Sequence, residues 1–369
     1  MKTKKKKALI VSGVSWNETW QRHQTNASIL AEFGYEVDYI NGVKTSALTL
    51  KNIISKIKSK FGFRNKKTCI VNNKLDNNIK LIPSYFIPPT GKLSKLINCK
   101  IYNLLYKNKL LSNNYDLVIY YVPIDSYKEI NKISHYRIYD CVRAFKLWGG
   151  YHNSLYDNEH AICESADEIM CDSYYIKEKY LSNYNVKQLI PYNEYKDNKV
   201  KRINSSIIKR ICYFGSVSNH IDVELLNLLS EKYQVNIWGK IDSKIDMSGN
   251  IKYHGYISDQ SELFEDIKRN SDMILIPYKG NMDGVFPAKL IASFALNIPV
   301  FTSEYYDSIR MSDLLYVYTD KDDLLKKIDG FKYDDFIIND NKRESILLES
   351  SKYIENLKLI LSNKCNDRG

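Results

Sequence analysis

The segment Ser271–Thr302 reads SDMILIPYKGNMDGVFPAKLIASFALNIPVFT and has the pattern of a βαβ unit. An apolar run ends at Pro277, and a polar, glycine-containing loop follows it. A helix-like segment then covers Val285–Leu296, and a second short apolar strand covers Pro299–Phe301. In parallel sheets built from such units, ligands bind beyond the carboxyl ends of the strands.

The expected helix over Val285–Leu296 begins directly after the loop. Its unpaired backbone N–H groups and the positive end of its dipole would therefore face the ligand crevice, which suits a phosphate group. Lys289 would lie one turn into this helix and add a full positive charge. The segment thus predicts a site for a phosphorylated donor molecule.

Strands and helices alternate through both halves of the chain, which predicts two doubly wound α/β domains. A polar, lysine- and asparagine-rich segment separates the halves. We expect an N-terminal acceptor domain over 1–190, a linker over 191–206, a C-terminal donor domain over 207–340, and a final helical segment over 341–369 that packs back on the N-terminal domain. The expected strands are Lys7–Ser12, Tyr35–Asn41, Asp116–Val122, Arg137–Tyr139, Glu168–Asp172, Arg210–Phe214, Gln234–Trp238, Ile251–Tyr253, Met273–Ile276 and Leu314–Tyr318. The expected helices are Thr19–Phe33, Ser154–Ser165, one from Ser173, Ile221–Leu229, Ser261–Arg269 and one near 342–361.

Composition narrows the class of protein. The 369 residues fit two domains, and a hydrophobic fraction of 44% is enough for two cores. No apolar run approaches the ~20 residues that span a bilayer, and the start MKTKKKKALIVSG is expected to form a strand rather than a signal peptide. The seven cysteines include no C-x-x-C pair, which favours reduced thiols in a cytosolic protein over disulfides or a zinc site.

The net charge of +11 has three readings: a solvated surface, attraction to anionic lipid, and attraction to nucleic acid. Lysines gather at the N-terminus and in two further segments, near Lys51–Lys67 and Lys92–Lys109. The segment Leu93–Leu111 is apolar on one helical face and lysine-rich on the other. It can lie on a membrane or pack on its own sheet, and charge alone does not decide between these.

Four segments together resemble a known family, through their order and spacing. They are Tyr213–Ser216 with Asp222 downstream, Asn250–Gly255, Asp272–Tyr278 with Pro287, Lys289 and Pro299–Val300, and Tyr139–Val142 followed by Glu159, Ala166–Asp167 and Asp172–Ser173. Trp16 and Arg22–Gln24 add to the match near the start. The chain resembles GT-B glycosyltransferases of the family 4-like group, in particular bacterial enzymes of surface-polysaccharide assembly of the teichuronic acid, O-antigen or capsule type.

The resemblance implies a GT-B fold, two Rossmann-like domains facing across a cleft, and transfer of a sugar from a nucleotide diphosphate or monophosphate donor. The acceptor would be a glycan or a lipid-linked glycan. The implied place is the cytoplasm, with peripheral attachment to the inner face of the plasma membrane as an option. The nucleotide sugar is a co-substrate, and no cofactor or metal is expected.

The sequence departs from the family pattern at two glutamates, eight residues apart, that contact the donor's sugar and ribose in retaining relatives. Here Gly284 and Ala292 stand at those positions, and Asn297 replaces a glycine. Asp283 is adjacent to the first position and can substitute for it. These changes leave the donor sugar and the stereochemical outcome open.

The expected donor site must stabilise the leaving diphosphate. Lys289, the N–H groups of Val285–Ala288 and the backbone at Gly215 and Ser216 can meet its charge, whereas tyrosines can stack on the base. The full set of expected donor-binding residues is Gly215, Ser216, Tyr256, Tyr278, Asp283, Gly284, Val285, Phe286, Pro287 and Lys289. His254 is either on the same crevice wall or a structural histidine.

An inverting enzyme also needs a general base on the acceptor hydroxyl. Asp140 at a strand end is the first candidate, with His23 and Asp125 as others. Arg143 can bind an acidic acceptor or the diphosphate. Trp16 and Trp20 can stack on a sugar ring, although core packing of Trp20 is an equal alternative.

Two other classes of function stay open. A nucleic-acid-binding protein or a DNA-directed glycosyltransferase fits the charge, although the basic residues are spread and form no recognisable nucleic-acid motif. A non-catalytic GT-B-like scaffold fits the absence of both glutamates.

Overall fold

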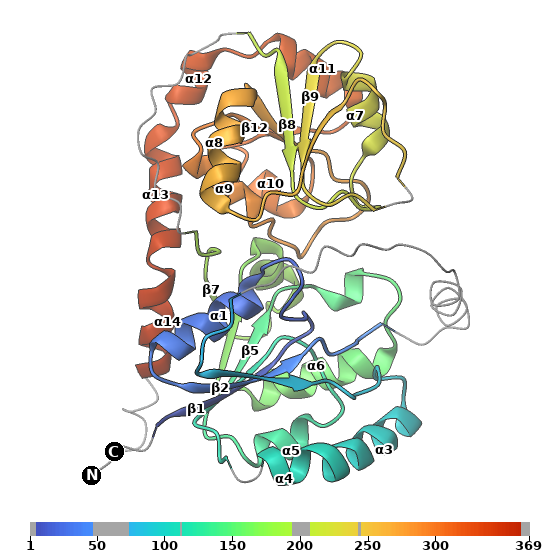
Figure 1. The fold of residues 1–369 in the computed structure, drawn as a ribbon, viewed down its shortest axis with the longest axis vertical. Helices are drawn as coiled ribbons and strands as arrows, with labels where there is room; N and C mark the ends of the chain where they lie inside the picture. The colour runs from blue at the N-terminus through green and yellow to red at the C-terminus, as the bar shows by residue number, and fades with distance from the viewer. Residues whose placement is uncertain (1–4, 47–73, 111–112, 194–206, 243–244, 363–369) are drawn as a thin grey trace. The chain divides into compact units, whose positions relative to one another are not determined.

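The computed structural model describes residues 5–46, 74–110, 113–193, 207–242 and 245–362. The chain divides into two compact units, which are coloured by residue number in Figure 1. The first unit contains the residues up to Cys171, Tyr180–Gln188 and the residues from Lys358 onward, and the second contains Asp172–Lys179 and Leu189–Leu357. Most of the expected linker, 194–206, and the basic segment near Lys51–Lys67 lie outside the described residues.

The first unit is built on a seven-stranded parallel sheet with strand order β3-β2-β1-β4-β5-β6-β7. Its middle strands are almost continuously buried, as expected for a parallel sheet covered on both faces. The order reverses between β1 and β4, so this is a doubly wound sheet. The strands are β1 (Lys7–Val11), β2 (Glu36–Asn41), β3 (Ile79–Pro83), β4 (Leu117–Tyr120), β5 (Arg137–Cys141), β6 (Glu168–Cys171) and β7 (Val186–Gln188).

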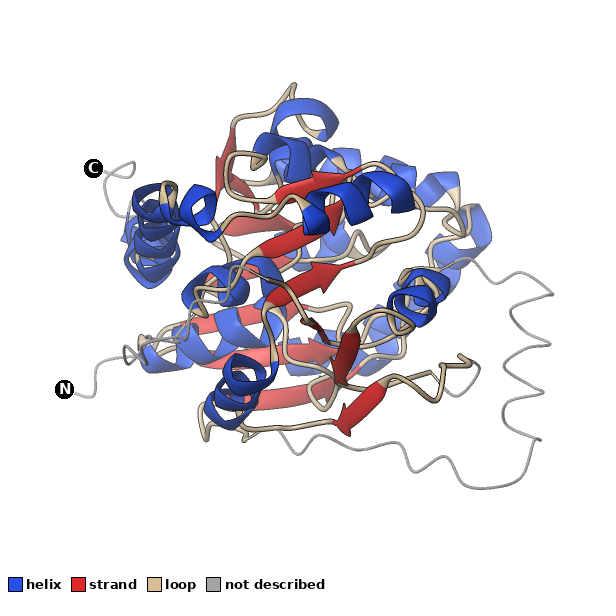
Figure 2. Cartoon of the chain, turned by 90° about the horizontal axis from the view of Figure 1, so that it is seen from above, coloured by secondary structure: helices blue, strands red, loops and turns tan. Residues whose placement is uncertain are grey.

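The helices of the first unit are α1 (Arg22–Glu32), α3 (Lys92–Ile101), the π-helical turn η1 (Tyr102–Tyr106), α4 (Lys107–Leu110), α5 (Tyr127–Asn131), the 3-10 turn η2 (Phe145–Leu147) and α6 (Asn153–Ser165). Helix α1 begins three residues later than expected, at Arg22, where the Gln24 side chain accepts the Gln21 N–H at 3.0 Å. Seen from above in Figure 2, the strands lie between helices.

The second unit has a six-stranded parallel sheet with strand order β10-β9-β8-β11-β12-β13, which reverses between β8 and β11. Two hydrophobic clusters fill this unit, one centred on Leu226 and Phe301 and the other on Ile276 and Leu290. The strands are β8 (Arg210–Phe214), β9 (Gln234–Trp238), β10 (Lys252–Gly255), β11 (Met273–Ile276), β12 (Val300–Ser303) and β13 (Tyr316–Tyr318). The predicted α/β class with two doubly wound sheets is confirmed.

The helices of the second unit are α7 (Val223–Leu229), α8 (Gln260–Asn270), α9 (Lys289–Ala295), α10 (Tyr306–Arg310), α11 (Lys321–Asp329), α12 (Tyr333–Ile337) and α13 (Asp340–Ser351). The π-helical turn η3 (Ile176–Tyr180) and α14 (Tyr353–Ser362) each contain residues of both units. The single terminal helix expected near 342–361 is wrong, since α13 ends at Ser351 and α14 begins at Tyr353.

The expected helix over Val285–Leu296 is also wrong at its start, because α9 begins only at Lys289. Gly284 has φ +75°, a left-handed conformation that does not continue into a helix. Phe286 precedes Pro287, and a residue before proline is disfavoured in the helical region. Residues 285–288 therefore belong to the loop, and the N-terminus of α9 lies at Lys289 rather than at Val285.

Candidate functional site

The carboxyl edge of the second sheet brings together two loops at the point where the strand order reverses. The loop after β8 and the loop after β11 are joined by backbone hydrogen bonds, from Asp222 N–H to Pro277 O and from Lys279 N–H to His220 O, both 2.8 Å. In doubly wound sheets this reversal point is where ligands bind. It is also where the sequence predicted the donor site.

Two glycines make this edge closely packed. Gly215, directly after β8, has φ +120°, and Gly239, directly after β9, has φ +130°. A Cβ atom on Gly239 would lie 2.1 Å from the carbonyl oxygen of Gly215, so only glycine allows the two loops to approach. The sequence analysis missed Gly239, although it follows a predicted strand in the same way as Gly215 does.

Lys289, the first residue of α9, directs its ammonium group to Gly215. Its Nζ atom would lie 3.0 Å from a Cβ on Gly215, and it donates to the Tyr213 hydroxyl at 3.1 Å. The same atom lies 4.3 Å from the centre of the Tyr213 ring and 5.6 Å from that of Tyr278. A cation is thus held between two aromatic rings and a glycine backbone at the reversal point.

The ammonium group of Lys289 has no carboxylate partner in the described part of the chain. The residue keeps some surface exposed, but its amine end is enclosed by protein atoms. Burial accordingly lowers the pKa of Lys289 to about 7, although the nearby Cys212 acts in the opposite direction. An enclosed cation without a counter-charge is unfavourable by itself and is well suited to receive an anion.

The expected tyrosines differ in their surroundings. Tyr278 is partly buried and packs edge to face against Tyr305, with ring centres 5.9 Å apart. Tyr256 is 39% exposed, and the Lys240 ammonium lies 4.9 Å from its ring centre. Of the two, Tyr278 contacts Lys289 and belongs to the site at the reversal point.

The loop from Asp283 to Pro287 is used mainly for structure. Asp283 accepts the Tyr306 N–H at 2.7 Å, at the start of α10, so the expected substitution for a missing glutamate is not supported by its contacts. Phe286 is buried in the core beside Leu290, so its side chain has a structural role, and its predicted donor contact through the backbone N–H stays a prediction. The Val285 N–H bonds the Met282 carbonyl at 3.3 Å and is not free for a phosphate.

The two remaining predicted donor residues, Ser216 and Pro287, lie at the carboxyl edge of the second sheet and in the core. The exposed Ser216 follows Gly215, and its carbonyl accepts the Tyr213 hydroxyl at 2.8 Å. Pro287 is buried, and its carbonyl accepts the Leu290 N–H at 2.8 Å.

His254 is a structural histidine. Its ring stacks on Trp238 at 4.1 Å, and its Nε2 atom lies 2.9 Å from Asn236 Oδ1. Burial lowers its pKa, against the attraction of nearby Asp266. The histidine and the tryptophan thereby fasten β10 to β9.

In the first unit, Asp140 lies fully buried on β5. Its Oδ2 atom accepts from Arg22 Nε at 2.8 Å and from Asn26 Nδ2 at 3.2 Å. Its Oδ1 atom is enclosed and has no hydrogen-bond partner in the described part of the chain. Asp140 is therefore held in a buried ion pair, and this geometry does not fit the accessible general base that the sequence suggested.

His23 lies on α1 close to that ion pair. Its Nδ1 atom is 2.8 Å from Ser12 Oγ, and its ring stacks on Tyr121 with centres 3.8 Å apart. Burial, and then the charges of Arg22 and Arg143, lower its pKa to about 3. His23 is neutral at physiological pH and is a very weak base, which counts against the predicted base role.

Arg143 is the predicted first-unit residue with an accessible charge. Its side chain is exposed, its guanidinium carbon lies 5.0 Å from the Trp148 ring centre, and Nη1 donates to the Tyr151 hydroxyl at 3.1 Å. The two aromatic residues hold the cation at the end of β5, where an anionic group can reach it.

Of three other predicted first-unit residues, Asp125 and Trp16 are buried and Trp20 is accessible. Asp125 is buried and accepts from Asn98 at 2.8 Å and Asn158 at 2.9 Å, which makes it a structural carboxylate. Trp16 is buried, whereas Trp20 is 44% exposed. The tryptophan available to a sugar ring is therefore Trp20.

A buried carboxyl on α6 belongs to a network that the sequence did not predict. Glu159 Oε1 lies 2.5 Å from the Tyr139 hydroxyl, and its other oxygen accepts from the Tyr180 hydroxyl. Burial raises the pKa of Glu159 to about 7, although these hydrogen bonds act in the opposite direction. The group thus changes charge near neutral pH.

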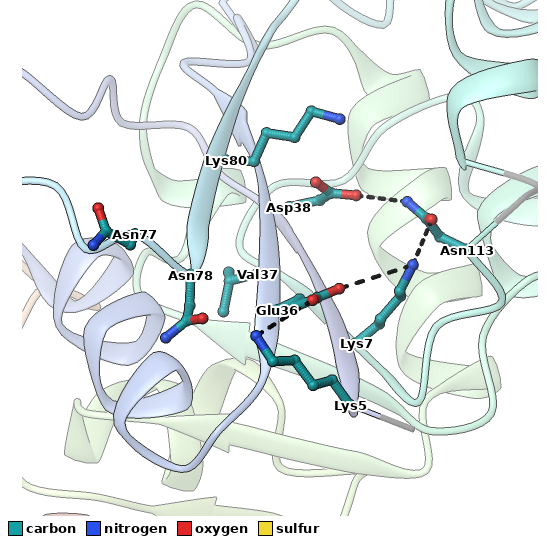
Figure 3. A pocket seen from close by; sticks show the side chains of 9 residues that line it. All are labelled: Lys5, Lys7, Glu36, Val37, Asp38, Asn77, Asn78, Lys80 and Asn113. Carbon is teal, nitrogen blue, oxygen red and sulfur yellow. Dashed lines mark hydrogen bonds and ion pairs between the residues drawn. The ribbon is translucent and has the colours of Figure 1, made fainter. Parts of the chain in front are cut away.

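Figure 3 shows a pocket at the opposite, amino edge of the first sheet. Lys7 and Glu36 are the first residues of their strands, and both Lys5 and Lys7 pair with Glu36, at 3.6 and 3.9 Å. Asn113 joins Lys7 to Asp38. The lining holds three lysines against two carboxylates, with both Lys5 and Lys7 paired to Glu36, and the pocket lies away from the strand ends where ligands bind in such folds.

Two negative findings apply to the described residues. No three His, Cys, Asp or Glu side chains in these ranges come together as a possible metal site. Within the same ranges, no helix has the length and apolarity to cross a bilayer.

Comparisons with known proteins identify the fold. No protein-family profile and no curated protein sequence match the chain. Solved structures match over nearly the whole chain. They include sucrose-phosphate synthase from Thermosynechococcus elongatus, with 11% identity, 98% of this chain and 97% of that chain covered, and a TM-score of 0.62. The lipopolysaccharide outer core galactosyltransferase WaaB matches with 14% identity, coverage of 97% and 99%, and a TM-score of 0.60. Anabaena HepE, solved in complex with UDP, matches with 9% identity, 95% coverage of both chains and a TM-score of 0.54.

These structures are GT-B proteins with two Rossmann-like domains, and this chain has the same fold. The predicted fold class is confirmed at that level.

Proposed function

We propose that this protein is a glycosyltransferase that moves a sugar from a nucleotide diphosphate donor to a glycan or lipid-linked acceptor in surface-polysaccharide assembly. The second unit would hold the donor. The observation that carries the proposal is the enclosed ammonium group of Lys289 beside Gly215, at the reversal point of the second sheet.

A diphosphate fits this point for electrostatic reasons. Lys289 has three N–H donors and uses one of them in its hydrogen bond to the Tyr213 hydroxyl, so two remain for a ligand. When the sugar bond breaks, negative charge develops on the leaving diphosphate, and a fixed cation in a poorly solvated place stabilises it strongly. Gly215 has no Cβ to compete with a ligand for the space beside the Lys289 ammonium, whereas its own N–H already donates to the Trp238 carbonyl at 2.8 Å.

The similar structures support a nucleotide sugar as the donor. HepE has been solved with UDP, and a further HepE structure contains UDP-glucose at a TM-score of 0.53 and 8% identity. The galactosyltransferase WaaB is associated by its name with lipopolysaccharide. The role in surface polysaccharide is proposed from this similarity together with the sequence resemblance.

Sugar recognition must differ from that of relatives with two glutamates. Ala292 is buried in the core, Gly284 has no side chain, and Asp283 is engaged with the Tyr306 N–H. We therefore expect other groups of the second unit, such as the exposed backbone at Ser216, to contact the sugar.

On the acceptor side, we propose that Arg143 binds an anionic group of the acceptor. Its guanidinium is exposed and is held by Trp148 and Tyr151, and its planar donors suit an anionic oxygen group. Arg22 and Asp140 would act as positioning residues, because their buried ion pair ties α1 to β5.

The test is a thermal-shift panel of nucleoside diphosphates and nucleotide sugars on the wild type, Lys289→Met and Lys279→Met. Lys279 is an exposed lysine that pairs with Glu224 at 3.8 Å, and it serves as the matched control. A ligand that binds the folded state raises the midpoint of unfolding. We expect one nucleotide class to raise it in the wild type and in Lys279→Met, but not in Lys289→Met.

A second measurement separates binding from catalysis. Release of the nucleoside diphosphate is followed with the stabilising nucleotide sugar and a set of glycan acceptors. Turnover supports the proposal. Binding without turnover on any acceptor favours a non-catalytic scaffold, and no stabilisation by any nucleotide contradicts the donor site.

A further inference from the structure

The helical stretch Lys92–Leu110, made of α3, η1 and α4, turns polar and aromatic residues inward. Its buried positions repeat every four residues and are Ser94, Asn98, Tyr102, Tyr106 and Leu110. Asn98 bonds both backbone groups of Ile87 at 2.9 Å and donates to Asp125 at 2.8 Å. Figure 1 shows α3 and α4 at the margin of the first unit, beside α5.

The inner side is thus fixed largely by hydrogen bonds. The Tyr106 hydroxyl donates to the Pro83 carbonyl at 2.7 Å and accepts the Tyr85 N–H at 2.8 Å. Ser94 accepts the Thr90 N–H at 2.8 Å. These bonds satisfy buried polar groups and hold the helix with little use of its leucines.

The apolar side chains point outward instead. The leucine face consists of Leu93, Leu96, Ile97, Leu104 and Leu105, whose exposed fractions run from 37% to 80%. A surface helix of a globular protein normally turns such residues to the core. Scattered exposed leucines are common, but a contiguous apolar face along one helical stretch marks an interaction surface.

Positive charge accompanies the leucine face. The stretch contains five lysines and no Asp or Glu. The lysines are Lys92, Lys95, Lys100, Lys107 and Lys109, and all five are exposed. The first four pair with no carboxylate among the described residues. Lys100 stands four residues after Leu96 and four before Leu104, so positive charge is interspersed with the apolar side chains of this helical stretch and complements a surface that is both apolar and anionic.

We propose that the leucine face and its lysines bind the surface of a bilayer that contains anionic lipids, with the helical stretch lying in the plane of the interface. The leucines would enter the boundary of the acyl chains, and the lysines would meet the phosphate groups. This proposal deepens the lipid-linked acceptor of the proposed function, because it brings the first unit to the membrane where such an acceptor resides.

A bilayer fits better than a protein partner or a second copy. A protein partner would cover the leucines but would also need acidic groups placed to match each neighbouring lysine. Anionic headgroups are mobile and can move to the lysines on the side of the helix that faces the bilayer.

The experiment is co-sedimentation of the full chain with vesicles, without nucleotide. Vesicles of phosphatidylcholine alone are compared with vesicles that also contain phosphatidylglycerol, at low and high salt. The test variants are Leu93→Gln with Leu104→Gln, and Lys100→Gln with Lys107→Gln. The matched controls are Ile338→Gln with Leu348→Gln, which are 76% and 56% exposed in the wild type, and Lys321→Gln with Lys326→Gln, both exposed.

We expect the wild type to bind vesicles that contain phosphatidylglycerol at low salt, and to bind them only weakly at high salt. Binding to vesicles of phosphatidylcholine alone should be weak. The leucine variant should bind about tenfold or more weakly, and the lysine variant about tenfold more weakly. Both controls should bind as the wild type does. Far-ultraviolet circular dichroism should show the leucine variant folded, since both side chains are exposed.

Three results would overturn the proposal. The first is that the wild type does not bind the anionic vesicles. The second is that the leucine variant binds them as well as the wild type does. The third is that sedimentation velocity shows a dimer for the wild type and a monomer for the leucine variant. The proposed function is tested separately, because the leucine variant should keep its nucleotide-induced thermal shift and Lys289→Met should keep vesicle binding.

Discussion

The ammonium nitrogen of Lys289 lies 3.0 Å from the point where a Cβ atom on Gly215 would stand. The two residues are far apart in the sequence, and they meet because β8 and β11 are neighbours at the reversal of the strand order. A side chain at position 215 would therefore contact the ammonium group of Lys289 directly.

Gly215→Ala should weaken nucleotide binding more than it weakens the fold. The new methyl group displaces the flexible end of Lys289, and the left-handed backbone at φ +120° adds a strain of about 1–3 kcal/mol. The measurements are chemical denaturation and nucleotide titration, with Gly249→Ala as control because its Cβ would meet nothing within 4 Å. Unchanged nucleotide affinity in a folded Gly215→Ala protein would contradict the placement of the ligand.

Gly239→Ala should affect the fold itself. Its Cβ would stand 2.1 Å from the carbonyl oxygen of Gly215, and both atoms belong to loops that follow central strands. We expect a loss of more than about 3 kcal/mol in the free energy of unfolding, because backbone rather than a flexible side chain must move. Chemical denaturation beside Gly249→Ala measures this, and equal stabilities of the two variants would show that the loops do not touch.

Lys289→Met should stabilise the unliganded protein while abolishing nucleotide binding. The pKa of Lys289 is lowered from 10.5 to about 7. Between these values the unfolded state binds more protons, so the stability of the wild type rises with pH across that window. The cost of the buried charge is fully present below pH 7.

We therefore expect Lys289→Met to exceed the wild type by about 1–3 kcal/mol at pH 7 or below, with a difference that shrinks toward pH 10. Denaturant melts at several pH values give the comparison. A variant that is less stable than the wild type at every pH would argue that the contacts of the ammonium group with Tyr213 and Tyr278 outweigh the cost of burying it.

Glu159→Gln should change how stability depends on pH. Burial raises the pKa of this carboxyl from 4.5 to about 7. Between those values the folded state binds more protons, so this group contributes stability that is lost as the pH rises through 7. Relative to the wild type, the variant should gain about 3 kcal/mol between pH 4.5 and 8.

The control for that comparison is Glu164→Gln, on the same helix, where the side chain is exposed and faces His160. A difference between Glu159→Gln and the wild type that stays constant with pH would mean that Glu159 is ionised throughout the range.

The sequence predicted the second sheet closely because its strands carry strong local signals. Arg210–Phe214, Gln234–Trp238 and Met273–Ile276 are apolar runs that stop at a glycine or a proline, and the structure has strands with the same bounds. Local composition suffices where a buried run is bounded by residues that break the strand.

Other features depend on contacts between distant segments. His23 is enclosed by Ser12 and Tyr121 because α1 turns that side toward the sheet. The spacing of residues in the sequence does not show which side of the helix is buried. Asp283 is engaged by the start of α10. The outward leucines of α3 were also unpredictable, because periodicity shows that a helix has an apolar side but not which side faces the sheet.

The start of α9 was predictable in principle. Phe286-Pro287 disfavours helix at residue 286, and the sequence pattern was read instead as one continuous apolar helix. Because α9 begins at Lys289, the expected phosphate contact rests on the Lys289 side chain, and the Gly215 N–H already donates to the Trp238 carbonyl.

The measurement we would make first is calorimetric titration of the stabilising nucleotide sugar in two buffers of different ionisation enthalpy, about two pH units above the Lys289 pKa. There the amine is mostly neutral in the free protein, and a bound diphosphate should restore its charge. We predict uptake of about one proton per nucleotide sugar in the wild type and in Lys279→Met, falling toward zero near pH 6. Binding without proton uptake, or equal uptake in Lys289→Met, would contradict a diphosphate site at Lys289.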